Sequence, residues 1–343
     1  MTVQTPTVHD ATMTSTASAR RPGSRARRLD LIQRVALPAA WVVIIIGFGI
    51  ASPHTFLTAA NFQTMLGSQA VLLVLTLALI VPLTAGDYDL SVAGVMTLSA
   101  MLIAVLNVQH GWPLGLAILA ALVFGALVGV VNGALMIFFG IESLIVTLGM
   151  GTLLGGITLW VSDSATISGI SQHLVDAVIA YRLFGISMAF YYGLILCAVM
   201  WYVFEYTAVG RRLLFVGRGR SVSKLSGVNV SGMRIGALVT SGTLAAGAGV
   251  LYAGTTGGAD PSSGASFLLP AFAAAFLGAT SIMPGRFNPW GTLLAVYFLV
   301  TGITGLQILG AQSFVQQLFY GGALLCAVAL SQLARGRVPL ETS

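Results

Sequence analysis

Charged residues are scarce in this sequence. Asp, Glu, Lys and Arg make up only 8% of the 343 residues, whereas hydrophobic residues make up 57%. A soluble domain carries roughly 25% charged residues, which it needs to cover its water-exposed surface. The composition therefore excludes an ordinary soluble protein and indicates a chain that crosses a membrane several times. The 41 glycines agree with this, because small residues let helices approach closely in lipid.

The sequence also lacks the residues of a disulfide framework, a metal site or a hydrolase. Its two cysteines, Cys197 and Cys326, lie in apolar runs, so we expect free thiols. No pair among the four histidines has metal-ligand spacing. No G-x-S-x-G motif occurs, and no set of Ser and His or of paired acids suggests an intramembrane enzyme. A phosphate-binding loop ending in Lys-Ser or Lys-Thr is absent too, so this chain does not bind ATP by that route.

Long apolar runs dominate what is present. A membrane-spanning helix needs roughly 20 mostly apolar residues. The sequence predicts an all-α polytopic membrane protein with about ten such spans, of which the eighth is short. The predicted spans are 35–53, 65–85, 90–108, 113–139, 143–161, 188–206, 235–255, 268–283, 289–310 and 313–333.

The basic residues indicate the orientation of these spans. Basic loops remain on the cytoplasmic side. With a disordered basic tail at 1–34 placed inside, the count puts 208–234, the turn at Arg286 and the C-terminal tail 334–343 inside as well. The weakly charged connection 162–187 falls outside. Four basic clusters therefore agree with one count of spans, and both termini are predicted to be cytoplasmic.

The spans form one predicted domain over 35–333, made of two halves with five spans each. Because five is odd, the two halves must face opposite ways across the membrane. Inverted repeats of this kind place a translocation path at the interface between the halves. The halves show no convincing sequence similarity, so this prediction rests on parity alone.

We call residues 208–234 the coupling segment. It is strongly basic, carries no acidic residue and is too long for a simple connector. Within it, SVSKLSGV predicts a short amphipathic helix that ends at Gly227. We expect this segment to dock a cytoplasmic partner. Its basic residues are Arg211, Arg212, Arg218, Arg220, Lys224 and Arg234.

We call residues 86–94, GDYDLSVAG, the acid motif. Asp87 and Asp89 lie between two apolar runs with no basic neighbour in the sequence. A carboxylate at the centre of a membrane helix costs about 2.5–3.5 kcal/mol. Three interpretations stay open: a turn at the membrane surface in which Asp89 caps the next helix, groups that line an aqueous path, or a proton relay.

Four motifs together resemble a known family. The acid motif is similar to the family pattern G-G-I-D-L-S-V-G, and Asn132 with Gly133, followed by LIVTLG at 144–149, matches a second pattern. The third match covers Gly210, Arg211 and residues 217–228, and the fourth covers Gly278, Thr280, Ser281, Gly291 and Thr292. Over about residues 60–333 the chain resembles the permease subunit of bacterial ribose-type ABC importers, related to the branched-chain amino-acid permeases.

The departures from the family pattern are specific. Asp87 stands where the family has Gly, and Tyr88 stands where it has Ile. In the coupling segment, Arg218, Gly219, Val222 and Ser223 replace Gly, Asn, Ala and Ala. The coupling geometry is therefore expected to be kept, while the acid motif allows a substrate other than ribose.

The resemblance implies a permease of the ten-span importer fold in a bacterial inner membrane, importing a monosaccharide or similar small polar solute. It implies a second permease copy, identical or paralogous, cytoplasmic ATPase subunits that hold the ATP and Mg, and an extracytoplasmic solute-binding protein. It implies no cofactor or enzymatic activity in this chain and no nucleic-acid partner. The alternatives are an ion-gradient-driven secondary transporter, an intramembrane enzyme, and a permease-like sensor or scaffold.

Two sets of candidate site residues follow from the motifs and the resemblance. The candidates for the substrate path are Asp87, Tyr88, Asp89, Ser91, Asn132 and Thr147. The candidates for coupling to the ATPase are Gly210, Arg211, Gly217, Arg218, Gly219, Arg220, Ser223, Lys224, Leu225, Ser226, Gly227, Val228 and Arg286.

Overall fold

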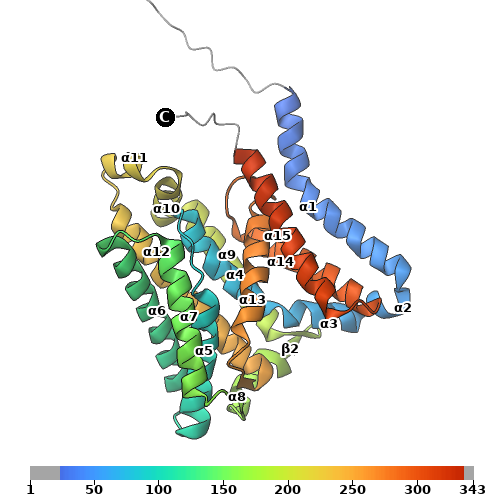
Figure 1. Cartoon of the computed structure of the whole chain (residues 1–343). Helices are drawn as coiled ribbons and strands as arrows, with labels where there is room; N and C mark the ends of the chain where they lie inside the picture. Colours follow the sequence, from blue (N-terminus) through green and yellow to red (C-terminus); the bar gives the residue numbers. More distant parts are fainter. Residues whose placement is uncertain (1–23, 336–343) are drawn as a thin grey trace, which may run out of the picture.

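The computed structural model describes residues 24–335 of the chain, and over these residues it is almost entirely helical (Figure 1). The prediction of an all-α polytopic membrane protein is confirmed. The α-helices are α1 (Ser24–Ala51), α2 (Pro53–Phe56), α3 (Ala59–Ser68), α4 (Ala70–Thr84), α5 (Val92–Ala104), α6 (Leu114–Phe138), α7 (Ser143–Val161), α8 (Gln172–Val175), α9 (Met188–Tyr206), α10 (Ala208–Arg218), α11 (Arg220–Leu225), α12 (Val230–Thr256), α13 (Gly264–Gly278), α14 (Pro289–Ile308) and α15 (Ser313–Arg335).

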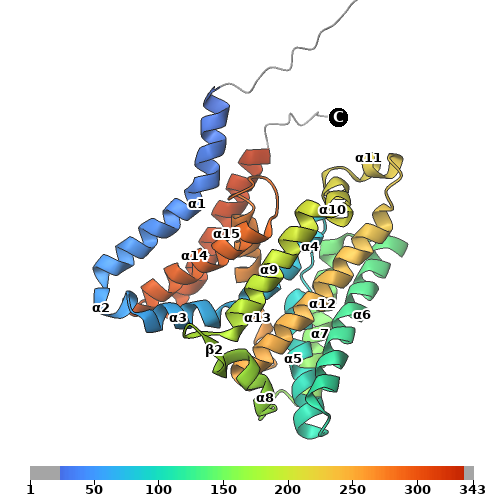
Figure 2. The ribbon, with the colours of Figure 1, turned by 180° about the vertical axis from the view of Figure 1, so that it is seen from behind.

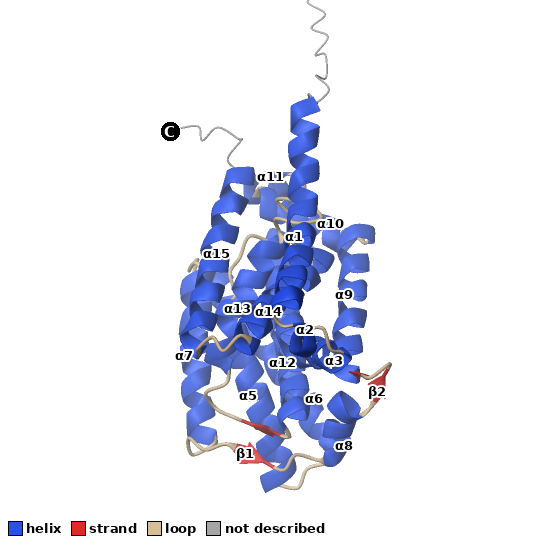
Figure 3. Cartoon of the chain, turned by 90° about the vertical axis from the view of Figure 1, so that its right-hand side faces the viewer, coloured by secondary structure: helices blue, strands red, loops and turns tan. Residues whose placement is uncertain are grey.

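Short strands and π-helical turns complete the fold. Strand β1 (Ile167–Ser168) pairs with β4 (Gly258–Ala259), and β2 (Arg182–Leu183) pairs with β3 (Ile186–Ser187), both antiparallel. Both pairs lie toward the end of the molecule opposite α11 (Figure 3). The π-helical turns are Val105–Gln109 and Asp176–Ala180.

Each of the ten predicted spans coincides with an apolar helix. Among the described residues, seven helices are long and apolar enough to cross a membrane, and the bent pair of α3 and α4 makes up to eight. Two shorter apolar helices, Gly264–Gly278 and Ser313–Ala329, correspond to the eighth and tenth predicted spans. The bend between α3 and α4 measures 40°, so the second span is broken near Gln69.

Two predicted boundaries were wrong. Helix α1 begins at Ser24, so residues 24–34 are helical rather than part of a disordered tail. Arg and Leu, which favour helix, are frequent there. The rest of that tail, 1–23, and residues 336–343 lie outside the described residues. Helix α13 ends at Gly278 rather than at 283, because a turn follows in which Ile282 has a φ of +58°.

The helix ends fall at two ends of the molecule. The start of α1, the helices α10 and α11, and the last turns of α15 lie at one end, and α8 lies at the opposite end (Figures 1 and 2). This arrangement agrees with the span count, which places the coupling segment and both tails on one side of the membrane.

Helices α4 and α12 form the centre of the packing. Helix α12 packs against α4, α5 and α6, and every residue of α4 is buried. A helix that is apolar on all sides belongs in the interior of a membrane bundle. Glycines bring α12 and α6 together: a Cβ at Gly125 or Gly129 would overlap the α12 backbone at Gly242 or Leu238. Such small-residue contacts are typical of helix pairs in lipid.

Candidate functional site

The acid motif forms the turn between α4 and α5, at the same end of the molecule as α10 and α11 (Figure 1). Helix α4 ends at Thr84, and Gly86 adopts a left-handed φ of +79°, which glycine tolerates without strain. The Asp87 N–H then donates to the carbonyl of Pro82 at 3.0 Å. This tight reversal turns the Asp87 side chain inward.

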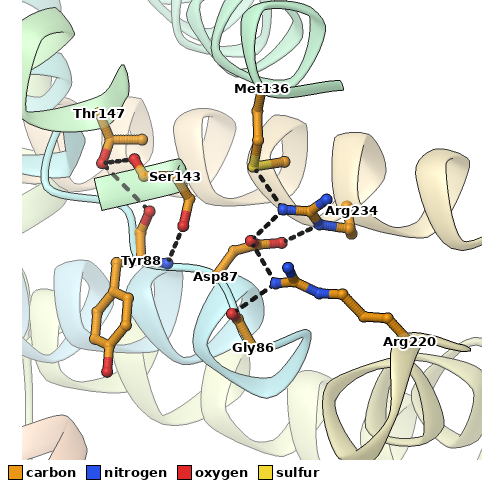
Figure 4. Close-up of polar contacts among 8 residues, drawn as sticks. All are labelled: Gly86, Asp87, Tyr88, Met136, Ser143, Thr147, Arg220 and Arg234. Atoms are coloured by element: carbon orange, nitrogen blue, oxygen red, sulfur yellow. Dashed lines mark hydrogen bonds and ion pairs between the residues drawn. The ribbon is translucent and has the colours of Figure 1, made fainter. Parts of the chain in front are cut away.

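Asp87 binds two arginines of the coupling segment (Figure 4). Its side chain is 1% exposed. The carboxylate accepts hydrogen bonds from Nε and Nη2 of Arg234, both at 2.7 Å, and from Nη2 of Arg220 at 2.8 Å. Arg220 also donates to the Gly86 carbonyl at 2.8 Å, and Arg234 contacts Sδ of Met136 at 3.1 Å. The Arg234 contact is bidentate, the strongest geometry of a guanidinium with a carboxylate. We call Asp87, Arg220 and Arg234 the arginine clamp.

The arginine clamp joins residues that the sequence assigned to two different candidate sets. Asp87 was a candidate for the substrate path and Arg220 a candidate for coupling, and the two side chains form one ion pair. Arg234 was not among the candidate site residues. Its position as the last basic residue of the coupling segment was the available signal.

Asp89 belongs to a second, fully buried polar network. One carboxylate oxygen accepts the N–H of Ser91 at 3.1 Å and its Oγ at 2.5 Å, while the other accepts Oγ of Ser241 at 2.8 Å. Nδ2 of Asn132 donates to the same Ser91 Oγ at 2.9 Å. Asp89 therefore binds Ser91, the residue that precedes α5, rather than capping that helix with its own side chain, and it also joins the turn to α12. Ser241 lies in a Gly- and Ala-rich run of α12 that carried no signal in the sequence.

Burial governs the charge state of Asp89, which lies in the turn outside the spanning helices. Desolvation raises the pKa of its carboxyl above the ordinary value, and the hydrogen bonds from Ser91 and Ser241 lower it by less. The two neighbouring carboxylates thus differ in surroundings: Asp87 contacts two cations, whereas Asp89 contacts only neutral donors.

Thr147 attaches the acid motif to α7. Its Oγ1 accepts the Leu90 N–H at 3.0 Å, donates to the Ser143 carbonyl at 2.7 Å and lies 3.3 Å from the Tyr88 carbonyl. Ser143 Oγ accepts the Tyr88 N–H at 3.0 Å. The Tyr88 side chain itself is 42% exposed, and its ring points away from Asp87 (Figure 4). Of the six path candidates, Tyr88 is therefore the one whose side chain is exposed, because the others are buried.

The coupling segment folds as two short helices, α10 and α11, followed by the start of α12, which carries Arg234. Helix α11 begins at Arg220, one residue before the predicted amphipathic stretch, and ends at Leu225, two residues before Gly227, which has a φ of +79°. Ser223 Oγ lies 2.9 Å from the Phe215 carbonyl and 2.8 Å from the Gly219 carbonyl, which fixes the angle between α10 and α11. Leu225 is 88% exposed, so the tip of α11 presents an apolar side chain to its surroundings.

Helix α10 is pressed onto the end of α4. A Cβ at Gly217 would overlap the carbonyl oxygen of Thr84, so only glycine permits this approach. Beside the contact lies a hollow of about 470 Å³, lined by Thr84, Gly217, Arg218 and Arg286 among others. Arg286 pairs with Glu205 of α9 at 3.1 Å. The coupling segment therefore touches the acid motif through both backbone contact and ion pairs.

The remaining coupling candidates lie around this contact. Gly210 packs on the carbonyls of Val203 and Phe204, and a Cβ there would overlap them. Arg211 donates to the Tyr206 carbonyl at 3.4 Å. Lys224 and Ser226 are exposed on or just after α11, and Gly219 and Val228 flank it half-buried.

These features define a multi-pass membrane protein in which the short helices α10 and α11 pack at the end of the central helix α4. Residues 35–328 match the family model described as "Branched-chain amino acid transport system / permease component". The chain belongs to this permease family. It is therefore a permease subunit of a transport system and not itself an enzyme.

Curated relatives cover most of the chain. It is 29% identical over 291 residues to the D-allose transport system permease protein AlsC of Escherichia coli, covering 85% of this chain and 89% of the relative. It is 30% identical to the autoinducer 2 import system permease protein LsrD of Salmonella typhimurium, covering 86% and 90%. The fructose import permease protein FrcC of Rhizobium meliloti is also 30% identical, covering 86% and 84%. No solved structure is significantly similar to the chain.

Proposed function

We propose that this chain is the membrane-spanning permease subunit of an ATP-driven importer of a monosaccharide or a similar small polar solute. The named relatives support the substrate class, because they serve D-allose, autoinducer 2 and fructose. Each is similar to this chain over at least 84% of both lengths. ATP and Mg would be held by a separate cytoplasmic subunit.

The coupling segment is the proposed docking surface for that ATP-binding subunit. The observation that carries this is the position of α11, which extends from the bundle with Val222 59% and Leu225 88% exposed. Exposed apolar side chains surrounded by Arg and Lys suit a protein partner, because interface cores are apolar and their rims polar. Lipid does not cover these side chains if the segment lies on the cytoplasmic side, as its charge predicts.

The arginine clamp gives docking a route to the membrane interior. A displacement of α11 moves Arg220, which holds the Asp87 carboxylate and the Gly86 carbonyl. Those two residues continue directly from α4 and lead into α5, and Gly217 presses on the same helix end. Movement of the partner would therefore reach the central helices without a flexible link between them.

The remaining partners follow from the same proposal. A second permease copy, identical or paralogous, would complete the translocation path, and an extracytoplasmic solute-binding protein would deliver the solute at the end that carries α8. Both termini would be cytoplasmic, in a bacterial inner membrane. A single transmembrane domain would span 35–333, and the N-terminal segment before it would be helical from Ser24 onward.

Co-purification tests the docking surface. The tagged chain is purified in mild detergent from its own cells, and the accompanying proteins are identified. We expect an ATP-binding subunit in stoichiometric amount, lost when Val222 and Leu225 are both changed to Glu. The matched control is Leu309→Glu, a 52% exposed leucine at the end of α14 away from α11.

Two results would contradict the proposal. If the wild-type chain came out alone, no stable ATPase docks on it. If the ATPase remained bound to the Val222→Glu/Leu225→Glu variant, α11 would not be the docking surface. Replacement of Leu225, Ser226 and Gly227 by three charged residues is a second variant, which also removes the glycine that ends α11.

A further inference from the structure

A cavity lined in part by polar side chains lies between α3 and the β2–β3 hairpin. Figure 2 shows that α3 and β2 lie away from α11. The cavity has a volume of about 280 Å³. Pockets for drug-sized ligands measure about 300–1,000 Å³, so this cavity suits a smaller solute such as a single sugar ring. It is lined by Ala60, Gln63, Thr64, Gly67, Ser68, Ile179, Arg182, Gly185, Ser187 and Thr255.

Two glycines let the two walls of this cavity approach closely, because each lies against a polar side chain of the other wall. A Cβ at Gly67 of α3 would overlap Oγ of Ser187 on the hairpin. In the opposite direction, a Cβ at Gly185 of the hairpin would overlap the side-chain amide of Gln63 on α3. Each wall thus carries a glycine opposite a hydrogen-bonding group of the other wall. Gly185 also has a φ of +81°, a conformation that glycine adopts without strain.

The polar groups of this cavity have hydrogen-bonding capacity to spare. Within the described part of the chain, the buried Oγ of Ser187 has no hydrogen-bond partner. The Gln63 amide makes only a long contact, 3.4 Å, to the Phe184 carbonyl. A buried hydroxyl without a partner costs stability and calls for an explanation, which a bound solute would supply here.

We propose that this cavity binds the transported solute, and that the solute is an uncharged polyhydroxyl compound of monosaccharide size. Amide and hydroxyl groups both donate and accept, as sugar hydroxyls require. Among the described residues that line the cavity, Arg182 is the charged one, and it lies exposed on the hairpin. This inference rests on the proposed function. It adds a binding position for the solute near the end of the bundle proposed to be extracytoplasmic.

The site also explains the break between α3 and α4. A straight second span would continue the line of α4, whereas the 40° bend turns α3 aside toward the hairpin. Helix α3 contacts β3 and α9 in this position. The bend therefore places Gln63 and Gly67 opposite the hairpin.

Uptake kinetics test the site in cells that carry the complete transport system. The chromosomal copy is replaced by Ser187→Ala or Gln63→Leu, and uptake of labelled D-allose, D-fructose and D-ribose is measured against concentration. We expect KM for the transported sugar to rise about 5- to 10-fold for each variant, the loss of one hydrogen bond to the solute. The control is Gln172→Leu at an exposed position of α8 outside the cavity.

Thermal stability of the purified variants separates binding from structure. Ser187→Ala removes a hydroxyl that is buried without a partner, so the empty protein should unfold at the same or a higher temperature. A merely structural serine would lower the unfolding temperature and the amount of protein in the membrane. A raised KM with unchanged stability supports the site.

The possible failures are distinguishable. If the wild-type cells take up a sugar and both variants keep KM within twofold, the cavity is not the solute site and the proposed function stands. If deletion of the chain leaves uptake of all three sugars unchanged, the monosaccharide importer and the site are both overturned.

Discussion

The arginine clamp predicts that two arginines on one carboxylate contribute very differently to stability. Arg234 is 14% exposed and binds Asp87 through two hydrogen bonds, whereas Arg220 is 45% exposed and binds it through one. Breaking a buried ion pair by removing one partner costs about 3–5 kcal/mol, because the other charge is left uncompensated. Exposed pairs contribute only about 0–1 kcal/mol.

The expected values follow from these exposures. Arg234→Gln should lower the free energy of unfolding by about 3 kcal/mol, and Arg220→Gln by less than about 1 kcal/mol. Asp87→Asn should lower it by about 3 kcal/mol. Because Asp87→Asn and Arg234→Gln break the same contact, the double variant should cost much less than the sum, with a coupling energy of about 2–3 kcal/mol.

A double-mutant cycle measures these quantities. The purified variants are unfolded in mixed micelles by increasing SDS, and helix content is followed by far-UV circular dichroism. Arg220→Gln is the matched control, because it removes the same group from the same carboxylate. Two results would refute the view that the more buried ion pair contributes more to stability. One is an equal loss for the two arginine variants, and the other is a coupling energy below about 0.5 kcal/mol between Asp87 and Arg234.

The remaining predictions concern the contacts around the clamp. Asp89→Asn should lower the free energy of unfolding by less than about 1.5 kcal/mol in the same assay, because the amide can still accept a hydrogen bond from Ser91 and donate one to Ser241. A loss as large as that of Asp87→Asn would contradict this. Gly217→Leu should abolish uptake while the ATPase still co-purifies, because the overlap with Thr84 displaces α10 from α4 and leaves α11 exposed; normal uptake would show that the contact is dispensable. Gly129→Leu should destabilise the protein by about 2 kcal/mol or more through separation of α6 from α12, whereas Gly149→Leu, in open space on α7, should change little.

The fold was predictable because its signals are local. Each span is recognisable from its own apolar run, and the basic loops indicate which side of the membrane they occupy. The boundaries failed where local signals conflict. Residues 24–34 are basic like a linker yet rich in helix formers, and α13 stops early because the turn after Gly278 satisfies its own backbone.

The site was predictable only in part because its contacts are not local. Arg234 and Asp87 lie 147 residues apart, and no charge or spacing rule links them. Ser241 is one hydroxyl on a small-residue helix, and its role appears only when α12 packs against the acid motif. The cavity beside Ser187 depends on glycines of two separate elements, neither of which forms a motif with the other.

The clamp also constrains the order in which its residues can have been acquired. Gaining or losing either Asp87 or Arg234 alone leaves a buried charge without its partner, whereas the more exposed Arg220 costs little by itself. A lineage that carried glycine at the position of Asp87 could therefore gain Arg220 at any stage, but whichever of Asp87 and Arg234 came first passed through a less stable intermediate. The same coupling governs loss, in which Arg220 can disappear first while Asp87 and Arg234 depend on each other.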